Sequence, residues 1–209
     1  PDKHGGTHAC GELMRLHLER ADVIWCNSQF TRKDFLDYFP NADPSRLKVA
    51  LLGGGKSFSP ATPPDVTRAL MACGVPPTSR YILSLSTLEP RKGMLRLIRA
   101  FASLQEKGQL ADMHLVLVGQ KGWQYDAIVR AAYRLGGHVH LTGFLPDSDL
   151  GALMTGCTCF AYLSEYEGFG LPVVEAMACG SPMVVTEATS LPEVAGDAGI
   201  LVPAMDDAA

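Results

Sequence analysis

The feature that most constrains the fold is an alternation, from Arg80 onward, of short apolar runs with segments of helical periodicity. Each apolar run is short and continuous, as expected for a strand that is buried on both faces. Strands that alternate with helices form a parallel sheet with helices on both sides, so the predicted class is α/β. We expect strands at residues 81–87, 113–119, 138–142, 157–164, 182–186 and 199–202, and helices at 93–107, 125–135, 147–155 and 171–179.

A cluster of glycine and proline marks the best candidate for a domain boundary. The run Gly53-Gly54-Gly55 is followed by three prolines between residues 60 and 64, which is typical of a linker. We expect residues 1–53 to be the end of an N-terminal domain with the entry to a hinge. Residues 54–79 would be an interdomain linker and a first helix, and 80–209 a C-terminal domain that is truncated at its end. The chain lacks a starting Met, so Pro1 is expected to be an internal point of a longer protein.

The composition argues against several classes of protein. The net charge is −4 without a long run of like charges, which argues against a protein that coats nucleic acid. No stretch approaches the roughly 20 apolar residues of a membrane-spanning helix. None of the six cysteines forms a Cys-x-x-Cys pair, so a reducing, cytoplasmic setting is expected. Cys157 and Cys159 share one expected strand and one face, where buried free thiols are favoured over a vicinal disulfide or a metal site.

The loop after the expected strand 157–164 carries the most chemical information. Gly168 and Gly170 flank Phe169 directly before a helix that contains Glu175. Glycines let backbone N–H groups approach a ligand, and a helix N-terminus offers unpaired donors and a positive dipole end to an anion. A carboxylate at Glu175, or at Glu167 in the loop, can accept hydrogen bonds from a ribose diol or from sugar hydroxyls. Taken alone, each glutamate is more typical of a helix surface or of a partner for the helix dipole.

A second loop follows the expected strand 81–87 and reads Glu89-Pro90-Arg91-Lys92-Gly93. Ligands of open parallel sheets bind beyond the carboxyl ends of the strands, so two adjacent cations at this place could face a diphosphate. Arginine would supply a fork of donors and lysine a point charge. Because an isolated Arg-Lys pair is more often merely solvated, this loop alone leaves both interpretations open.

Taken together, these strings resemble the retaining glycosyltransferases of family four, also called group one. Glu167 and Glu175 are separated by seven residues around Gly-Phe-Gly-Leu-Pro, and the similarity continues through residues 175–185, 190–194 and 196–199. The resemblance covers nearly the whole chain, with its motifs in the family's order. It implies the GT-B fold, in which two Rossmann-like domains face a cleft and the C-terminal one, here residues 80–209, binds a nucleotide-sugar.

The resemblance also implies roles for residues of the glycine loop. Glu175 would hydrogen-bond the ribose hydroxyls, and Glu167 would contact the transferring sugar as one of three expected catalytic residues. Backbone groups at Phe169, Gly170 and Leu171 would meet the sugar and the diphosphate.

The string at residues 89–93 resembles the family's diphosphate clamp. Arg91 and Lys92 would be its cations and the other two catalytic residues, because they could stabilise the charge that grows on the leaving diphosphate. Glu89 is expected to bind substrate in the same loop. A subgroup with Thr-Leu-Glu-Pro-Arg-Lys, which often includes mannosyltransferases, is similar to this chain, and mannose is therefore the favoured donor sugar.

Two further loops complete the expected substrate site. Gly119 and Lys121 belong to a Gly-x-Lys-Gly-Trp string that is similar to the same subgroup, and Leu145 lies where the family contacts the base through backbone groups. Trp123 either lines the cleft or caps a helix. Backbone hydrogen bonds do not distinguish guanine, uracil and adenine at this stage.

The string Asp147-Ser148-Asp149 has the form of a metal motif found in a different transferase fold. Here it begins an expected helix, where Asp and Ser are preferred capping residues. The family generally needs no metal for catalysis, and the histidines show no metal-ligand spacing. We therefore expect neither a metal nor another cofactor.

The sequence predicts a retaining hexosyltransferase that moves mannose from a nucleoside-diphosphate sugar such as GDP-mannose to an acceptor hydroxyl, in bacterial polysaccharide or glycolipid synthesis. The acceptor, a sugar or a lipid-linked glycan, would lie on the N-terminal domain, which could also contact a membrane peripherally. We expect a cytoplasmic location, at the inner face of the membrane, and no nucleic-acid partner. This chain alone is expected to bind the donor weakly and to be inactive. Two alternatives stay open: a nucleotide-sugar 2-epimerase, which shares the architecture, and a non-catalytic nucleotide-sugar binding module.

Overall fold

The computed structural model describes residues 5–204, apart from some side chains of the first helix. The chain divides between Leu52 and Gly53 into two compact units, Pro1–Leu52 and Gly53–Ala209. Each unit has its own parallel strands.

The first unit is small. Its two short strands pair in parallel, and α2 begins where the Ser28 hydroxyl accepts a hydrogen bond from the N–H of Thr31 at 2.9 Å. Its elements are α1 (Gly5–Arg20), β1 (Ile24–Cys26), α2 (Gln29–Tyr38), the 3-10 turn η1 (Pro44–Arg46) and β2 (Leu47–Val49).

The second unit is built on a six-stranded parallel sheet in the order β5-β4-β3-β6-β7-β8. This confirms the predicted α/β class. The strands are β3 (Arg80–Leu85), β4 (Met113–Val118), β5 (Val139–Gly143), β6 (Cys159–Tyr162), β7 (Met183–Glu187) and β8 (Ile200–Pro203). The helices are α3 (Pro63–Ala72), α4 (Met94–Glu106), α5 (Asp126–Arg134), α6 (Asp147–Gly156), α7 (Leu171–Ala178) and α8 (Leu191–Ala195), with 3-10 turns η2 (Pro90–Lys92) and η3 (Gly136–His138).

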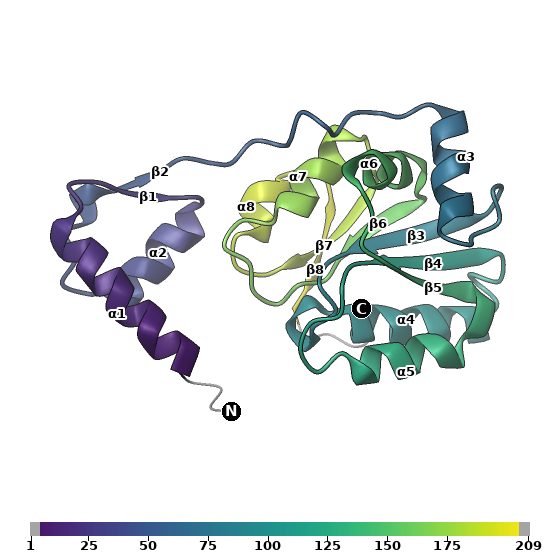
Figure 1. Cartoon of the computed structure of the whole chain (residues 1–209), viewed down its shortest axis with the longest axis horizontal. Helices are drawn as coiled ribbons and strands as arrows, with labels where there is room; N and C mark the ends of the chain where they lie inside the picture. The colour runs from purple at the N-terminus through teal and green to yellow at the C-terminus, as the bar shows by residue number, and fades with distance from the viewer. Residues whose placement is uncertain (1–4, 205–209) are drawn as a thin grey trace. The chain divides into compact units, whose positions relative to one another are not determined.

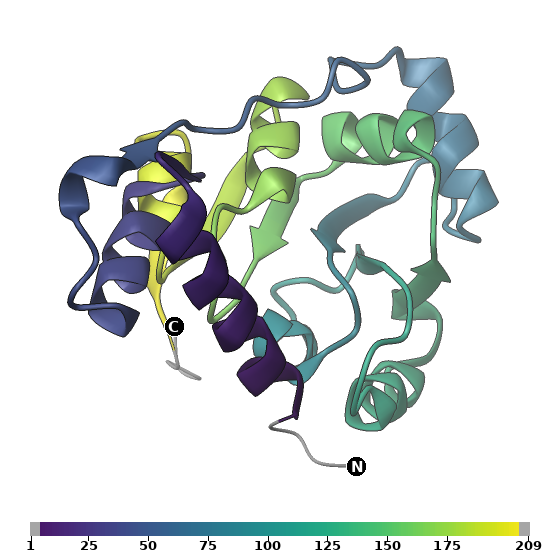
Figure 2. The ribbon, with the colours of Figure 1, turned by 60° about the vertical axis from the view of Figure 1, so that its left-hand side comes forward.

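Helices cover this sheet on both faces. Figure 1 shows α4 and α5 on one face and α3, α6 and α7 on the other, and Figure 2 shows the same layers from a second direction. Successive residues of β4 alternate between the layers: Val116 and Val118 pack towards α6, whereas Leu115 and Leu117 pack towards α4 and α5. This double burial is the reason why the strands read as continuous apolar runs. None of the helices within residues 5–204 is long and apolar enough to cross a membrane.

The expectation that Cys157 and Cys159 share one face of a strand is wrong. Helix α6 continues to Gly156, and Cys157 is its extended C-cap residue. The chain bends at Thr158, and β6 begins only at Cys159. The Cys157 thiol is buried in the core on the α6 side, with its Sγ 3.1 Å from the carbonyl oxygen of Met154. Cys159 lines the opposite face of the sheet, and both thiols are free.

The string Asp147-Ser148-Asp149 begins a helix as expected, but not through a capping side chain. The N-cap residue of α6 is Pro146, and no side-chain capping hydrogen bond forms. Asp149 instead forms an ion pair with Arg68 of α3, with 2.6 Å between Oδ1 and Nη1. Both carboxylates lie in the first turn, where the positive end of the helix dipole stabilises them.

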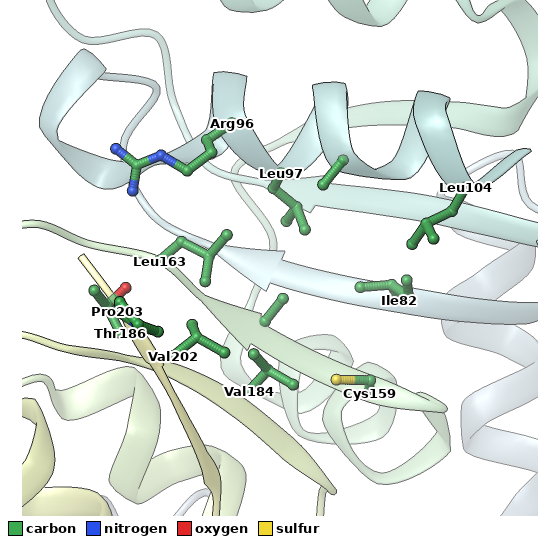
Figure 3. Close-up of a pocket in the computed structure, with 12 residues that line it drawn as sticks. Ile82, Arg96, Leu97, Leu104, Cys159, Leu163, Val184, Thr186, Val202 and Pro203 are labelled. Carbon is green, nitrogen blue, oxygen red and sulfur yellow. The ribbon is translucent and has the colours of Figure 1, made fainter. Parts of the chain in front are cut away.

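An apolar pocket of about 190 Å³ lies between α4 and the sheet. In Figure 3, Leu97 and Leu104 of α4 and Ile82, Val184 and Val202 of the strands surround the same space. None of the expected substrate-binding residues lines this pocket, so it is not the expected donor site.

Candidate functional site

The order of the strands reverses between β3 and β6. The chain adds β4 and β5 on one side of β3, and then β6, β7 and β8 extend the sheet on its other side. In an open parallel sheet, ligands bind beyond the carboxyl ends of the strands at such a switch point. The two loops that leave this point, residues 86–93 and 163–170, carry the two strings that the sequence singles out.

These two loops are in direct backbone contact. The N–H of Glu165 donates to the carbonyl of Arg91 at 2.8 Å. Gly93 has a φ of 71°, and a Cβ added there would lie 2.1 Å from the carbonyl oxygen of Leu163. Only glycine combines this backbone angle with so close an approach. The loop of cations is therefore held against the loop of Glu167.

Lys92 and Glu167, which are 75 residues apart in the chain, form an ion pair at the switch point. The Lys92 Nζ lies 2.5 Å from Oε1 of Glu167, and the two side chains are only 12% and 13% exposed. The hydroxyl of Tyr162, at the end of β6, donates to the same oxygen at 2.6 Å. The structure thus brings together the cation expected at the diphosphate and the carboxylate expected at the sugar.

The protonation state of Glu167 follows from these contacts. Burial raises the pKa of its carboxyl, but hydrogen bonds from Lys92, Tyr162 and Ser164 outweigh burial and hold the pKa below its usual value. Burial, and then the charge of Glu167, raise the pKa of Tyr162, so its hydroxyl keeps its proton. Glu167 is therefore a carboxylate at neutral pH, with Tyr162 as a neutral donor.

Arg91 lies beside this pair and is also held by the chain. Its Nε is 3.2 Å from Oε2 of Glu89, and its Nη1 donates to the carbonyl of Tyr166 at 3.1 Å. The Arg91 side chain is 42% exposed, whereas that of Glu89 is 16% exposed. The guanidinium is therefore oriented by Glu89 while part of it faces solvent.

Helix α7 begins at the end of the Glu167 loop. Its N-cap residue is Gly170, with φ of 99°, and no side chain caps the helix. A Cβ added at Gly170 would lie 2.6 Å from Cδ2 of Leu191, so that this position also requires glycine. Phe169 is buried and Leu171 is exposed. Pro172 has no N–H, and that of Val173 donates to the carbonyl of Gly170 at 3.0 Å. Within the described residues, the N–H groups of Gly170 and Leu171 remain for an anionic group.

Glu175 lies on α7, one turn inside the helix. Burial, and then the charge of Asp147, raise the pKa of its carboxyl. No hydrogen bond or ion pair joins this carboxyl to another residue of the described part of the chain. A half-buried carboxyl without a protein partner has acceptor capacity left for hydroxyl groups of a ligand.

The loops after β4 and β5 converge on the end of β3. The N–H of Leu88 donates to the carbonyl of Gln120 at 2.8 Å, and the N–H of Gly119 donates to that of Gly143 at 2.9 Å. Gly119 has a φ of 148°, and a Cβ there would lie 1.9 Å from the carbonyl oxygen of Ser86. The backbone of these loops is therefore fixed at the same edge of the sheet.

The side chains in these loops lie apart from the central ion pair. The Lys121 ammonium is 5.1 Å from the centroid of the Tyr125 ring, a cation–π contact. Leu145 packs against the core on the α6 side, and Trp123 is about half exposed. No hydrogen bond or ion pair within the described residues links Gly119, Lys121 or Leu145 to the pair of Lys92 and Glu167.

Three hydroxyl side chains that hold the Glu167 loop are not predicted from the sequence: Tyr162, Thr189 and Ser190. A signal existed for Tyr162, because a buried tyrosine usually needs a hydrogen-bond partner and this one ends a strand that enters the site. For Thr189 and Ser190 the sequence offers no comparable signal, since their contacts depend on how β7 returns to the loop.

Solved structures with this fold are glycosyltransferases of the GT-B class. The structure of HepE from Anabaena, in complex with UDP and glucose, matches with a TM-score of 0.80 and 24% identity, over 99% of this chain and 57% of that one. WaaG, a glycosyltransferase involved in lipopolysaccharide biosynthesis, matches with a TM-score of 0.71 and 20% identity, over 86% and 48%. At these identities the likeness shows the fold, and it confirms the predicted GT-B architecture.

The sequence model of the family glycosyl transferases group 1 matches residues 71–209, and the chain belongs to this family. The O-antigen chain mannosyltransferase B of Escherichia coli is 34% identical over 191 residues, which cover 90% of this chain and 49% of that protein. A D-inositol 3-phosphate glycosyltransferase of Corynebacterium glutamicum (strain R) is 28% identical over 194 residues, covering 88% and 46%. The chain thus spans about half the length of these relatives. The group-one resemblance is confirmed, whereas family four and retention of configuration stay predictions.

Proposed function

We propose that the protein containing this chain transfers mannose from GDP-mannose to an acceptor hydroxyl with retention of configuration, in bacterial polysaccharide or glycolipid synthesis. This chain would supply the donor site. The observation that carries the proposal is the buried pair of Lys92 and Glu167 at the switch point, beside the uncapped start of α7. A cation and a helix N-terminus at one place match the diphosphate of a nucleotide-sugar, and the carboxylate beside them matches its sugar hydroxyls.

Each part of the donor has a candidate partner. Lys92 and Arg91 would bind the diphosphate, together with the backbone of Phe169, Gly170 and Leu171 at the start of α7. The base and its surroundings would lie at the loops after β4 and β5, near the backbone at residues 119–121 and 145.

The hydroxyl groups of the donor would meet the two glutamates. Glu175, whose carboxyl has no partner in the described chain, would accept from the ribose, and Glu167 would accept from the transferring sugar. Glu89 would act through Arg91, which it orients at 3.2 Å. These assignments divide the site into a ribose end, a diphosphate centre and a sugar end.

The proposed chemistry is electrostatic. When the bond between the sugar and the diphosphate breaks, negative charge grows on the leaving oxygen, and Lys92, Arg91 and the start of α7 would stabilise it. The low pKa of Glu167 makes it a poor proton donor, and this argues against a glycosidase-like role as acid catalyst. Because fixed cations supply the countercharge, we propose that no metal or other cofactor takes part.

The choice of mannose rests on the loop at residues 87–92, Thr-Leu-Glu-Pro-Arg-Lys, and on the mannosyltransferase relatives. Calorimetry on the full-length protein tests the proposal, with GDP, UDP, GDP-mannose and UDP-glucose as ligands and without added metal. We expect GDP and GDP-mannose to bind, and Lys92→Ala to weaken GDP by about 1.5–3 kcal/mol, as for a lost hydrogen bond to a charged group. Lys107→Ala, at the exposed end of α4, is the matched control and should leave binding unchanged.

A turnover assay distinguishes a transferase from a non-catalytic binding module and from a 2-epimerase. Incubation of the full-length protein with GDP-mannose and candidate sugar acceptors should release GDP and form an α-linked product, seen by NMR of the anomeric proton. Binding without turnover would favour a non-catalytic module, and epimerised nucleotide-sugar would favour a 2-epimerase. Binding of UDP in preference to GDP would overturn the proposed donor.

A further inference from the structure

The short connection between β7 and α8 contains a strained residue. Thr189 has a φ of 54°, and within the described chain the only other residue besides glycine with a positive φ is Gln124. A β-branched residue rarely adopts this angle, and such conformations persist only where the surrounding structure holds them. Strain of this kind is concentrated at functional sites, so its surroundings are informative.

Residues 189–191 of this connection contact successive residues of the Glu167 loop, and we call these three residues the clamp. The Thr189 Oγ1 accepts a hydrogen bond from the N–H of Glu167 at 3.0 Å. The hydroxyl of Ser190, which is fully buried, lies 2.9 Å from the carbonyl oxygen of Glu167 and 3.0 Å from that of Phe169. Leu191 then packs where a side chain at Gly170 would be. The clamp therefore follows the loop from Glu167 to the start of α7.

Glycine at position 189 would adopt the same backbone angle without strain, but it would have no hydroxyl. The strained threonine is thus coupled to one specific contact, the hydrogen bond to the N–H of Glu167. We propose that Thr189 is a positioning residue that sets the place of the Glu167 carboxylate for the transferring sugar of the donor. This inference rests on the proposed function, in which Glu167 meets that sugar.

The division of contacts within the clamp makes the effect selective. Within the described residues, the Thr189 hydroxyl is bonded only to Glu167, whose carboxylate is held by Lys92 and Tyr162. The Ser190 hydroxyl contacts the carbonyl oxygens of Glu167 and Phe169, and it would still hold the backbone that leads to α7, where the diphosphate is expected, without the Thr189 hydroxyl. Loss of the Thr189 hydroxyl should therefore disturb the sugar end of the site and leave the diphosphate end in place.

Three substitutions in the full-length protein test the proposal. Thr189→Val keeps the shape and the β-branch but removes the acceptor, Thr189→Ser keeps the acceptor, and Thr189→Gly removes both the acceptor and the strain. We measure Kd for GDP and for GDP-mannose by calorimetry, and the melting temperature of each variant. UDP and UDP-glucose serve as the ligand pair if the wild type prefers them.

For Val and Gly we expect Kd for the nucleotide-sugar to rise about three- to tenfold, the effect of one lost hydrogen bond, with Kd for the nucleoside diphosphate unchanged. Thr189→Ser should stay within about twofold of the wild type for both ligands, since it keeps the acceptor. Thr189→Gly should melt no lower than Thr189→Val, because glycine relieves the strain. That combination separates positioning from a merely structural role.

The proposal is overturned if Thr189→Val and Thr189→Gly weaken both ligands equally, or neither of them, or if Thr189→Ser is as impaired as Thr189→Val. A wild-type protein that binds neither ligand overturns the proposed function, and this inference with it. A wild type that binds both ligands, with variants that do not distinguish them, overturns this inference alone.

Discussion

The largely buried pair of Lys92 and Glu167 should be strongly coupled energetically. Removing one partner of such a pair leaves the other charge buried, which costs about 3–5 kcal/mol. With side chains 12% and 13% exposed and the Tyr162 hydroxyl still bonded to Glu167, we expect the lower end, about 3 kcal/mol, for Lys92→Met. Glu167→Gln should cost about 2 kcal/mol, because its amide oxygen still accepts from Lys92. The double variant, which removes both charges, should lose about 3 kcal/mol of the free energy of unfolding. This is about 2 kcal/mol less than the sum of the two single losses, and that difference is the coupling energy.

Urea denaturation of the full-length protein, followed by far-UV circular dichroism at neutral pH, measures this cycle. The exposed pair of Arg80 and Asp112, with side chains 62% and 68% exposed, supplies a matched control through Arg80→Met and Asp112→Asn. Its coupling should stay below about 1 kcal/mol, because water screens exposed charges. A coupling between Lys92 and Glu167 no larger than that of the control would refute the reasoning, since burial is what makes the central pair strong.

Two further predictions concern the pH dependence of donor binding and the glycines of the site. The folded pKa of Glu175 is raised, and a diol is bound best by the ionised form. Affinity for GDP-mannose, whose diphosphate has no terminal phosphate to titrate near neutral pH, should therefore fall as pH drops through a value above the usual ~4.3 of glutamate. Glu175→Gln should lower affinity by about 1 kcal/mol at neutral pH and remove this acid limb, as measured by calorimetry across pH; a variant that kept the limb would contradict the assignment. Gly119→Ala should unfold at clearly lower temperature than Gly136→Ala. Both positions have positive φ, but only Gly119 would also place a Cβ 1.9 Å from a backbone oxygen, whereas Gly136 has nothing within 4 Å. Equal melting temperatures for the two alanine variants would show that the close contact carries no cost.

The regular elements of the second unit could be predicted because their signal is local. Both layers of the sheet are covered, so each strand is a continuous apolar run, and the helix at residues 94–106 repeats its buried positions at helical spacing. The prediction that Cys157 lies on a strand with Cys159 failed because the end of α6 could not be located from the sequence. Cys157 sits in an apolar run that continues into β6, and nothing in its neighbours shows that α6 still occupies the preceding residues.

The sequence motifs of the site could be predicted, but the contacts between their residues could not. The cations at residues 91–92 and the loop of Glu167 follow different strands, and the order that makes those strands neighbours is a property of the whole sheet. The same holds for Thr189, which reaches Glu167 only because β7 lies next to β6. Asp149 illustrates the converse: its local preference for capping a helix is overridden by Arg68 of α3.

In the free site, both expected diphosphate cations are already paired with carboxylates of the chain, Lys92 with Glu167 and Arg91 with Glu89. A diphosphate would therefore exchange partners with these cations rather than neutralise unpaired charge. The gain on binding is then the difference between two charge-assisted interactions, so the ion pairs keep the cations in place while moderating ground-state affinity. In the proposed reaction, the leaving diphosphate gains charge in the transition state, and the balance would shift from carboxylate to phosphate. A site arranged in this way would favour the transition state over the bound donor, which is the condition for raising the rate rather than only tightening binding.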